Sequence, residues 1–274
     1  MSVTRFAANG MISLMTDFGL SDPYVGVMKA AILNRHPAAR LVDLTHSIPA
    51  FQVHEAGFWL AKCWRYFPVG TVHLTVVDPG VGTQRGMVLL ETDGQLFVAP
   101  DNGLLHAVWH SRAASETCCW RTFDLTDLAD LNLPQPSHTF HGRDIFAPLA
   151  AELSAGRIAP ESIGNLTQPP VQVALYPGTS GQIVSIDHFG NLLTDLDASI
   201  LNQFSQPALR FRDRQIPLLP TYEMAQPGKL LALVNSWGSL EIALAQGNAQ
   251  LLLAAQKGEI VSVVELDLSD KIST

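Results

Sequence analysis

The pattern of apolar residues changes once along the chain, and this change limits the folds that the chain can adopt. Residues 11–155 alternate short apolar runs with longer amphipathic ones, whereas short β-like runs separated by turn residues recur beyond residue 178. The first pattern is typical of an α/β layer and the second of a small sandwich or barrel. The sequence therefore predicts an α/β N-terminal domain with a mostly parallel central sheet flanked by helices, followed by a smaller all-β, barrel-like C-terminal domain.

The expected elements of the first domain follow from the period of each apolar run. Strands are expected at residues 11–15, 41–44, 71–77, 86–91 and 95–99, and helices at 24–35, 54–66 and 144–153. The last two strands are expected to pair through Asp93-Gly94, since this dipeptide is typical of tight hairpin turns. Asp17, Asp78 and Asp101 each follow a strand directly, where open parallel sheets bind ligands.

Prolines accumulate between the two domains, where the periodicity lapses, at Pro160, Pro169, Pro170 and Pro177. Such a segment favours a linker over a regular element. The expected domains are therefore residues 11–160 and 178–270. Strands of the second domain are expected at residues 181–186, 192–196, 208–211, 230–234, 239–244 and 260–265.

Composition and charge exclude several classes of protein. The 274 residues are 47% hydrophobic and carry a net charge of −8, which allows a large core and argues against nucleic acid or an anionic membrane surface as a partner. No run reaches the roughly 18 apolar residues of a membrane span, and the first ten residues do not resemble a signal peptide. The three cysteines, Cys63, Cys118 and Cys119, lack zinc-ligand spacing and favour a reducing compartment. We therefore expect a cytoplasmic protein.

Two short segments concentrate ionisable side chains beside glycines and prolines. Residues 77–85 place Asp78 and Arg85 around a turn rich in glycine, and residues 139–148 place His141 just before a predicted helix. Loops of this kind present chemistry more often than packing. For each segment alone, however, the simpler interpretation is a strand-ending turn with a surface ion pair, or a structural histidine.

Polar turns elsewhere allow two interpretations each. Asp17 could cap the helix that follows, or its carboxylate could bind a ribose diol through two hydrogen bonds. Residues 187–191 join an aromatic ring to an amide, which could stack on a purine and bind its edge, or could simply form a hairpin turn. Residues 235–238 have the same two interpretations, and Asp101-Asn102-Gly103, taken alone, is a turn sequence.

Seven motifs occur in one order along the chain. They are Met15-Thr16-Asp17-Phe18-Gly19, Asp43-Leu44-Thr45-His46, residues 76–83, Ala99-Pro100-Asp101-Asn102-Gly103, residues 139–148, Phe189-Gly190-Asn191 and Asn235-Ser236. This series resembles the S-adenosylmethionine hydroxide adenosyltransferases, which are adenosine-forming S-adenosylmethionine hydrolases related to the fluorinase and the chlorinase. The resemblance covers residues 11–265 and implies an α/β domain followed by a β-barrel-like domain. It also implies a homotrimer with active sites between the N-terminal domain of one subunit and the C-terminal domain of the next.

The resemblance assigns roles to residues at matching positions. The hydrolase's Asp-Arg-His set falls on Asp78, Arg85 and His141. The residues that would bind substrate are Asp17 for the ribose, Asp22, Pro23 and Tyr24 in the loop lining the site, Phe189, Asn191, Leu244 and Gln246 for adenine, and Asp187, Ser236 and Trp237 for the methionine end. Asp195 stands where relatives commonly have asparagine.

The implied reaction is attack of water or hydroxide on C5′ of S-adenosyl-L-methionine, which yields adenosine and L-methionine. The sulfonium is already an activated leaving group, and a nearby metal ion would repel it, so we expect neither a metal nor another cofactor. We expect Asp78 to orient the water and stabilise charge, because Arg85 lowers its basicity. A neutral His141 is then expected to accept the water's proton.

Three other functions remain as alternatives. A halide-using relative is disfavoured, because halogenases lack the Asp-Arg-His set and carry a long insertion after this loop, whereas Thr83 here runs almost directly into Arg85. A sensor that binds adenosine or S-adenosylmethionine would show binding without product. A metal-dependent hydrolase would lose activity on chelation, and its ligands would be Asp17, His46, Asp78 and His141.

Overall fold

The chain divides into two compact units, residues 1–173 and 174–274, each with its own sheet and core. The computed structural model describes residues 5–112, 118–133, 135–168 and 178–266. Half of the predicted linker, residues 169–177, lies outside the described residues, as does the end of the expected second domain, residues 267–270.

The described part of the first unit contains a seven-stranded sheet with the order β2-β1-β3-β5-β4-β6-β7. Its strands are β1 (Met11–Thr16), β2 (Arg40–Thr45), β3 (Val72–Val76), β4 (Met87–Thr92), β5 (Gln95–Pro100), β6 (Cys118–Phe123) and β7 (Asn165–Thr167). Strands β2, β1, β3 and β5 run parallel to one another, whereas β4 pairs antiparallel with β5 and β6, and β7 pairs antiparallel with β6. The sheet is therefore mixed, and the expected mostly parallel arrangement holds only for the half formed by β2, β1, β3 and β5.

The antiparallel half begins at a tight turn. Strands β4 and β5 meet at the predicted Asp93-Gly94 turn, where φ is 49° at Asp93 and 68° at Gly94. Two successive positive φ values are typical of a hairpin turn, which returns the chain beside itself. Strand β6 then pairs with the free edge of β4, and β7 pairs with β6. Strand β7 lies inside the segment expected to be a linker, so that expectation is wrong for residues 165–167.

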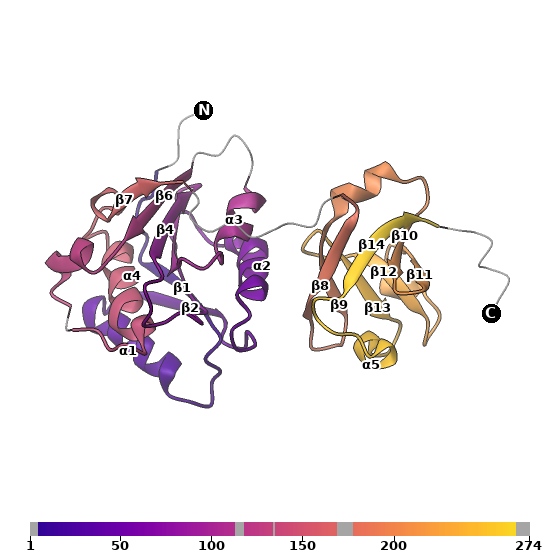
Figure 1. Ribbon diagram of the computed structural model, residues 1–274, viewed down its shortest axis with the longest axis horizontal. Helices are drawn as coiled ribbons and strands as arrows, with labels where there is room; N and C mark the ends of the chain where they lie inside the picture. The colour runs from indigo at the N-terminus through magenta and orange to yellow at the C-terminus, as the bar shows by residue number, and fades with distance from the viewer. Residues whose placement is uncertain (1–4, 113–117, 134, 169–177, 267–274) are drawn as a thin grey trace. The chain divides into compact units, whose positions relative to one another are not determined.

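Helices cover both faces of this sheet (Figure 1). On one face α1 (Tyr24–Arg35) packs against α4 (Ala147–Ser154), and on the other α2 (Val53–Cys63) packs against α3 (His106–Ser111). A π-helical turn, Gly142–Phe146, leads directly into α4, so this helical segment starts earlier than predicted. Short 3-10 turns lie at Trp64–Tyr66, Thr126–Leu131 and Pro160–Ser162. None of the helices in the described residues is long and apolar enough to cross a membrane.

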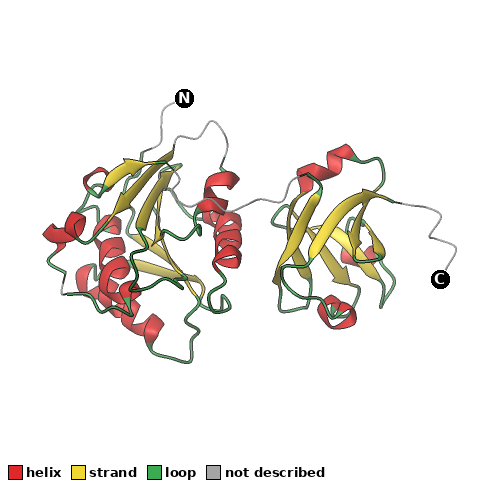
Figure 2. Cartoon of the chain, in the orientation of Figure 1, coloured by secondary structure: helices red, strands yellow, loops and turns green. Residues whose placement is uncertain are grey.

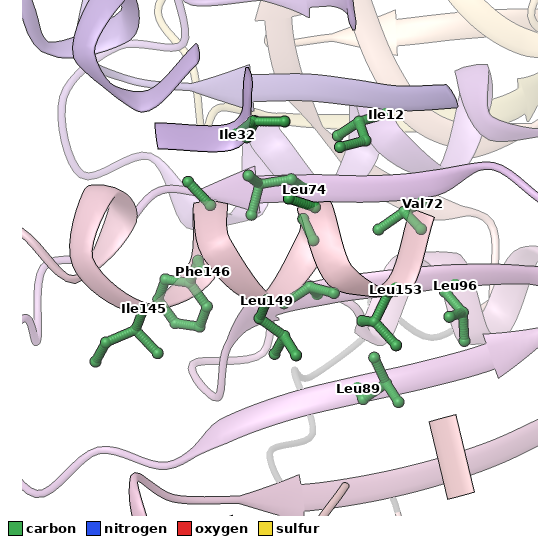
Figure 3. Close-up of a cluster of buried hydrophobic side chains, with 14 of the residues drawn as sticks. Ile12, Ile32, Val72, Leu74, Leu89, Leu96, Ile145, Phe146, Leu149 and Leu153 are labelled. Carbon is green, nitrogen blue, oxygen red and sulfur yellow. The ribbon is translucent and has the colours of Figure 1, made fainter. Parts of the chain in front are cut away.

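The core beneath α4 fixes the position of the turn that contains His141. Figure 3 shows Leu149 and Leu153 of this helix packed against the sheet, where Leu74 and Leu89 are buried with them. Burial of each leucine contributes roughly 1.5–3 kcal/mol relative to exposure. The helix is thus anchored, and the residues immediately before it are held beside the sheet.

The described part of the second unit is an antiparallel sheet with the order β11-β10-β14-β8-β9-β13-β12. Its strands are β8 (Ser180–Ile186), β9 (Leu192–Asp197), β10 (Pro207–Phe211), β11 (Arg214–Pro217), β12 (Leu230–Val234), β13 (Ser239–Leu244) and β14 (Ile260–Glu265). A bridge between Leu218 and Ala232 connects the two edges, so the sheet nearly closes into a barrel, as Figure 2 shows. The predicted all-β, barrel-like architecture is confirmed for this unit.

Small elements complete the second unit. A short helix, α5 (Ala249–Leu253), and 3-10 turns at Ala198–Gln203 and Tyr222–Met224 connect the strands. Asp195 has a structural contact here, because its Oδ1 accepts a hydrogen bond from the backbone N of Gln182 at 2.7 Å. A Cβ on Gly181 would lie 2.3 Å from the same oxygen, so only glycine leaves room for this carboxylate.

Candidate active site

Asp78 lies just beyond β3, in a turn that packs against the loop preceding His141. Gly82 of this turn has a φ of 76°, and a Cβ there would lie 2.2 Å from the carbonyl oxygen of His138. Glycine alone allows both this backbone conformation and this close approach. The glycine-rich turn seen in the sequence therefore brings the two ionisable segments together.

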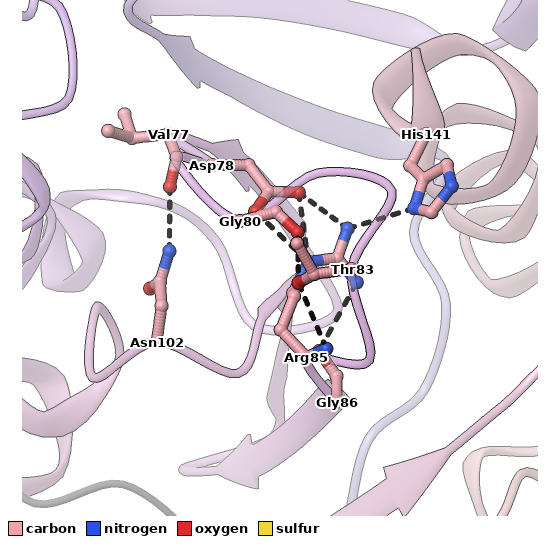
Figure 4. Close-up of polar contacts among 8 residues, drawn as sticks. All are labelled: Val77, Asp78, Gly80, Thr83, Arg85, Gly86, Asn102 and His141. Atoms are coloured by element: carbon pink, nitrogen blue, oxygen red, sulfur yellow. Dashed lines mark hydrogen bonds and ion pairs between the residues drawn. The ribbon is translucent and has the colours of Figure 1, made fainter. Parts of the chain in front are cut away.

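Arg85 joins Asp78 and His141 in one network, which is drawn in Figure 4. Its Nε donates to both carboxylate oxygens of Asp78 at 3.0 Å, and its Nη2 donates to Oδ2 of Asp78 and, at 3.0 Å, to Nδ1 of His141. The side chains of Arg85 and Asp78 are only 10% and 5% exposed, so water screens this ion pair little. The guanidinium also lies over the ring of Phe146, 5.3 Å from its centroid.

His141 is held as a neutral imidazole. Partial burial lowers its pKa, and the positive charge of Arg85 lowers it further. Because a guanidinium can only donate, Nδ1 of His141 must accept, and the proton of the neutral ring then lies on Nε2. The nitrogen available to a ligand is therefore a hydrogen-bond donor.

Asp101 lies next to this network, at the end of β5. Its backbone N donates to the carbonyl oxygen of Gly86 at 2.9 Å, and the following residue, Asn102, donates from Nδ2 to the carbonyl oxygen of Val77 at 2.8 Å. Burial raises the pKa of Asp101, and the charge of Arg85 opposes this rise. Its position after a strand was predicted from the sequence, but no catalytic role was assigned to it.

The loop after β1 carries four of the predicted binding residues. Oδ2 of Asp17 accepts from the backbone N of Phe51 at 2.9 Å. Asp22, Pro23 and Tyr24 are exposed at the start of α1. The loop is brought beside the His141 segment by aromatic contacts, since the ring of Phe140 lies 5.7 Å from that of Phe18 and 5.4 Å from that of Tyr24.

His46 holds this loop through contacts with Thr16 and Gly19. It is buried, its Nδ1 lies 2.8 Å from Oγ1 of Thr16, and its Nε2 lies 3.1 Å from Oδ1 of Asp43. Its carbonyl oxygen accepts from the backbone N of Gly19 at 2.8 Å. Both ring nitrogens thus face protein partners, which argues against His46 as a metal ligand. Among the described residues, no group of three or more His, Cys, Asp or Glu side chains could hold a metal ion.

In the second unit, Asp187, Phe189 and Asn191 form the turn between β8 and β9. Oδ1 of Asp187 accepts from the backbone N of Phe189 at 2.9 Å and of Asn191 at 2.8 Å, and its Oδ2 accepts from the Asn191 side chain at 3.0 Å. Gly190, with φ of 84°, packs against the side chain of Asn248. Phe189 is 72% exposed, so a planar ligand could stack on its ring.

The turn between β12 and β13 carries Ser236 and Trp237. Oδ1 of Asn235 accepts from the backbone N of Trp237 at 3.0 Å, and its Nδ2 donates to Oε2 of Glu241 at 3.2 Å. Glu241 is buried and also accepts from the hydroxyl of Tyr222 at 2.7 Å. Burial raises the pKa of Glu241, and Asp187 raises it further, so these carboxylates lie close enough to interact.

Leu244 is the last residue of β13, and Gln246 follows shortly after it. Leu244 is half-buried, whereas Gln246 is exposed and has a φ of 55°. The chain then enters α5, where the backbone N of Gln250 donates to the carbonyl oxygen of Gly190 at 3.0 Å. The segment after β13 therefore lies beside the turn of Phe189 and Asn191, and these four predicted adenine-binding residues gather at one end of the barrel.

Fold and site together define a two-domain protein whose α/β unit carries a shielded Asp-Arg-His network at the end of a central strand. Residues 12–164 match the SAM hydroxide adenosyltransferase N-terminal domain, and residues 181–262 match the SAM hydroxide adenosyltransferase C-terminal domain. The chain belongs to the SAM hydroxide adenosyltransferase family, in which SAM stands for S-adenosylmethionine.

Several relatives cover nearly the whole chain. The (R)-S-adenosyl-L-methionine hydrolase of Thermus thermophilus is 35% identical, over 90% of this chain and 96% of its own length. That of Salinispora arenicola is 34% identical, over 94% and 98%. The fluorinase of an Actinoplanes species is more distant, at 27% identity over 86% and 91%. A crystal structure of an uncharacterized conserved protein from Thermotoga maritima has a TM-score of 0.83 at 32% identity, covering 93% of this chain and 100% of that one.

Proposed function

We propose that this protein hydrolyses S-adenosyl-L-methionine to adenosine and L-methionine. The observation that carries the proposal is the Arg85 guanidinium bound to both Asp78 and His141, in a chain that belongs to this family. Relatives named as hydrolases are 34–35% identical along most of the chain, which supports the same reaction here.

The substrate itself explains why the network contains no obvious acid for the leaving group. In the reaction, the water oxygen forms a bond to C5′, the C5′–S bond breaks, and its electron pair converts the sulfonium into the neutral thioether of methionine. The remaining requirement is to place and activate one water molecule, whose pKa in bulk is about 15.7. Neither a metal nor another cofactor is needed for these steps.

Within this reaction, the Arg85 pair with Asp78 provides a rigid, shielded anchor. Asp78 balances the charge of Arg85 and holds the guanidinium plane, because both carboxylate oxygens are engaged. His141 presents the Nε2 proton to the water oxygen and so orients it. This differs from the expectation that His141 accepts a proton, since its Nδ1 is already bound to Arg85.

The binding residues fall into two sets by the chemistry of the substrate. In the first unit, the carboxylate of Asp17 would bind the ribose diol, and the loop of Asp22, Pro23 and Tyr24 would line the site. In the second unit, the remaining seven residues would bind adenine through Phe189, Asn191, Leu244 and Gln246, and the methionine end through Asp187, Ser236 and Trp237. Asp187 supplies a negative charge for the α-ammonium group.

Assembly and location are part of the proposal. We propose a homotrimer in which each site combines the first set from one subunit with the second set from the next. The three cysteines are free thiols in the structure, which supports a reducing, cytoplasmic location.

The names of these relatives specify the configuration of their substrate. Because L already fixes the α-carbon, the prefix (R) in these names describes the sulfonium, which is also a stereocentre. For the present chain we likewise propose the (R) sulfonium epimer as the better substrate.

The test is an assay of the purified protein in water enriched in oxygen-18, with EDTA present and with each sulfonium epimer in turn. We expect adenosine that carries the label in its 5′-hydroxyl, and faster turnover of the (R) epimer. Label-free adenosine, or no product despite bound ligand, would overturn the hydrolysis. Equal turnover of both epimers would overturn only the stereochemical part. A parallel assay with chloride or fluoride tests the halogenase alternative, since a 5′-halo product would identify it.

A further inference from the structure

Asp101 lies beside Arg85 with its carboxylate free. A Cβ on Gly86, the neighbour of Arg85, would lie only 3.2 Å from Oδ2 of Asp101. Within the described residues, no donor forms a hydrogen bond with this carboxylate. Asn102 fixes the turn, because its side chain donates to the carbonyl oxygen of Val77, directly before Asp78. The free carboxylate is therefore held close to the proposed water-binding network.

The other two groups of the network that could accept a proton, Asp78 and His141, are already bound to Arg85. Both oxygens of Asp78 accept hydrogen bonds from the permanently charged guanidinium of Arg85, so this carboxylate is already engaged by a cation. His141 could take a second proton only at Nδ1, and it would then lose its hydrogen bond from Arg85 and place two cations together. In the described part of the chain, the carboxylate of Asp101 is thus the one in this region that is not already engaged.

We propose that Asp101 accepts the proton of the attacking water, an inference that rests on the proposed hydrolysis. As the water oxygen bonds to C5′ and the electrons of the C5′–S bond pass to sulfur, one water proton passes to the Asp101 carboxylate. The carboxyl group then releases this proton to solvent. The products are adenosine, L-methionine and one proton, so atoms and charge balance.

The environment of Asp101 suits this role. Burial raises its pKa, so the ionised group is a stronger base than an ordinary aspartate, whose pKa is about 3.9. The base acts in its deprotonated form. The turnover number is therefore expected to fall as the pH drops through the raised pKa of Asp101, with an acid limb above the ordinary aspartate range.

The decisive experiment compares the full-length wild type with Asp101→Asn, which keeps the size and hydrogen-bonding shape of the turn residue. The matched control is Asp93→Asn, the same change at the exposed turn of the same hairpin. For each protein, adenosine formation is measured from pH 4 to 9 and the dissociation constant of the substrate by calorimetry. General-base catalysis contributes typically ~10²–10⁴-fold, so Asp101→Asn is expected to lose about that factor in turnover number, with little change in binding.

The pH profile distinguishes a base from a merely structural residue. We expect Asp101→Asn to lose the acid limb, and added formate to restore part of its rate, whereas Asp93→Asn keeps the wild-type profile. Asp101→Glu is a second variant, which should retain an acid limb at a lower rate even if the asparagine variant folds poorly. An acid limb unchanged in Asp101→Asn, or a turnover number within about threefold of wild type, would overturn the role of Asp101 alone. A wild type that forms no adenosine would overturn the hydrolysis and this role together.

Discussion

Arg85 donates a hydrogen bond to Nδ1 of His141 across 3.0 Å, with the same terminal nitrogen that binds Asp78. This single contact fixes the tautomer of the histidine and couples it, through Arg85, to the carboxylate of Asp78. The planar guanidinium is needed for this geometry, because its donors point in fixed directions toward two partners.

Arg85→Lys is therefore expected to lower the turnover number about 10²–10³-fold, since loss of one positioned donor typically has an effect of this size. A lysine ammonium keeps the charge but cannot bridge Asp78 and His141 as a planar fork. The measurement is steady-state adenosine formation. The matched control is Arg212→Lys in the second unit, an exposed arginine paired with Glu259, which should change the rate less than about twofold. An Arg85→Lys enzyme of normal activity would show that the fork is dispensable.

His141 is expected to titrate below the ordinary histidine pKa of about 6.5. Burial and the charge of Arg85 both disfavour its charged form, so the neutral ring persists as the pH falls below that value. The titration can be followed by the NMR chemical shift of its Cε1 proton, assigned with His141→Gln. A pKa above 6.5 would contradict the accepting role of Nδ1.

The buried His73 predicts a pH dependence of stability that is unrelated to catalysis. Its Nδ1 lies 2.6 Å from Oγ of Ser13, its Nε2 lies 2.7 Å from Oε1 of Gln95, and burial lowers its pKa to about 4. The unfolded chain, with a histidine pKa of about 6.5, binds more protons between these values. The stabilisation is therefore complete above pH 6.5 and is lost as the pH falls from 6.5 toward 4.

Between pH 6.5 and 5, this group is expected to reduce the free energy of unfolding of the first unit by about 1–2 kcal/mol. Urea unfolding followed by tryptophan fluorescence measures it, because four of the five tryptophans lie in that unit. His73→Gln should be less stable overall but should lose much of this pH dependence. His188→Gln, at an exposed position, should keep it; a dependence identical in all three proteins would rule out His73 as its source.

Strands with a clear apolar signal were predictable from the sequence, and polar or very short ones were not. The residues of β3 are buried throughout and mostly β-branched or apolar, so their pattern is unambiguous. By contrast, β6 contains cysteines, an arginine and a threonine with no strict alternation, and β7 has three residues. Their strand conformation comes from pairing with β4 and with each other, which is a tertiary effect that no local pattern encodes.

The same limit applies to the site. Asp78 and His141 stand out locally, because Asp78 follows a strand and precedes a turn rich in glycine, and His141 precedes Gly142 at the start of a helical segment. The hydrogen bond from Arg85 to His141 spans 56 residues and depends on how α4 packs, so no spacing could predict it. Glu241 could not be predicted for another reason: it lies on the face of β13 opposite to the core residues Leu240 and Ile242, and its burial and its bond to Tyr222 become evident only in the folded unit.

Asn235 offers a test of the second unit that leaves the water-binding network intact. Its Oδ1 accepts from the backbone N of Trp237 and of Ser239, and its Nδ2 donates to Glu241. Asn235→Ala removes these bonds from a turn proposed to hold the methionine end. At roughly 0.5–1.5 kcal/mol for each hydrogen bond, the expected result is a KM about tenfold higher, with a much smaller change in kcat.

A second variant at this position separates the turn bonds from the contact with the buried carboxylate. Asn235→Asp keeps the accepting oxygen but sets a second negative group against Glu241, so its KM should rise more at high pH, where both groups are ionised, than at low pH. Asn202→Ala, in an exposed 3-10 turn of the same unit, is the matched control and should behave as wild type. If Asn235→Ala lowered kcat and left KM unchanged, the turn would act on the chemical step, and its assignment to substrate binding would be wrong.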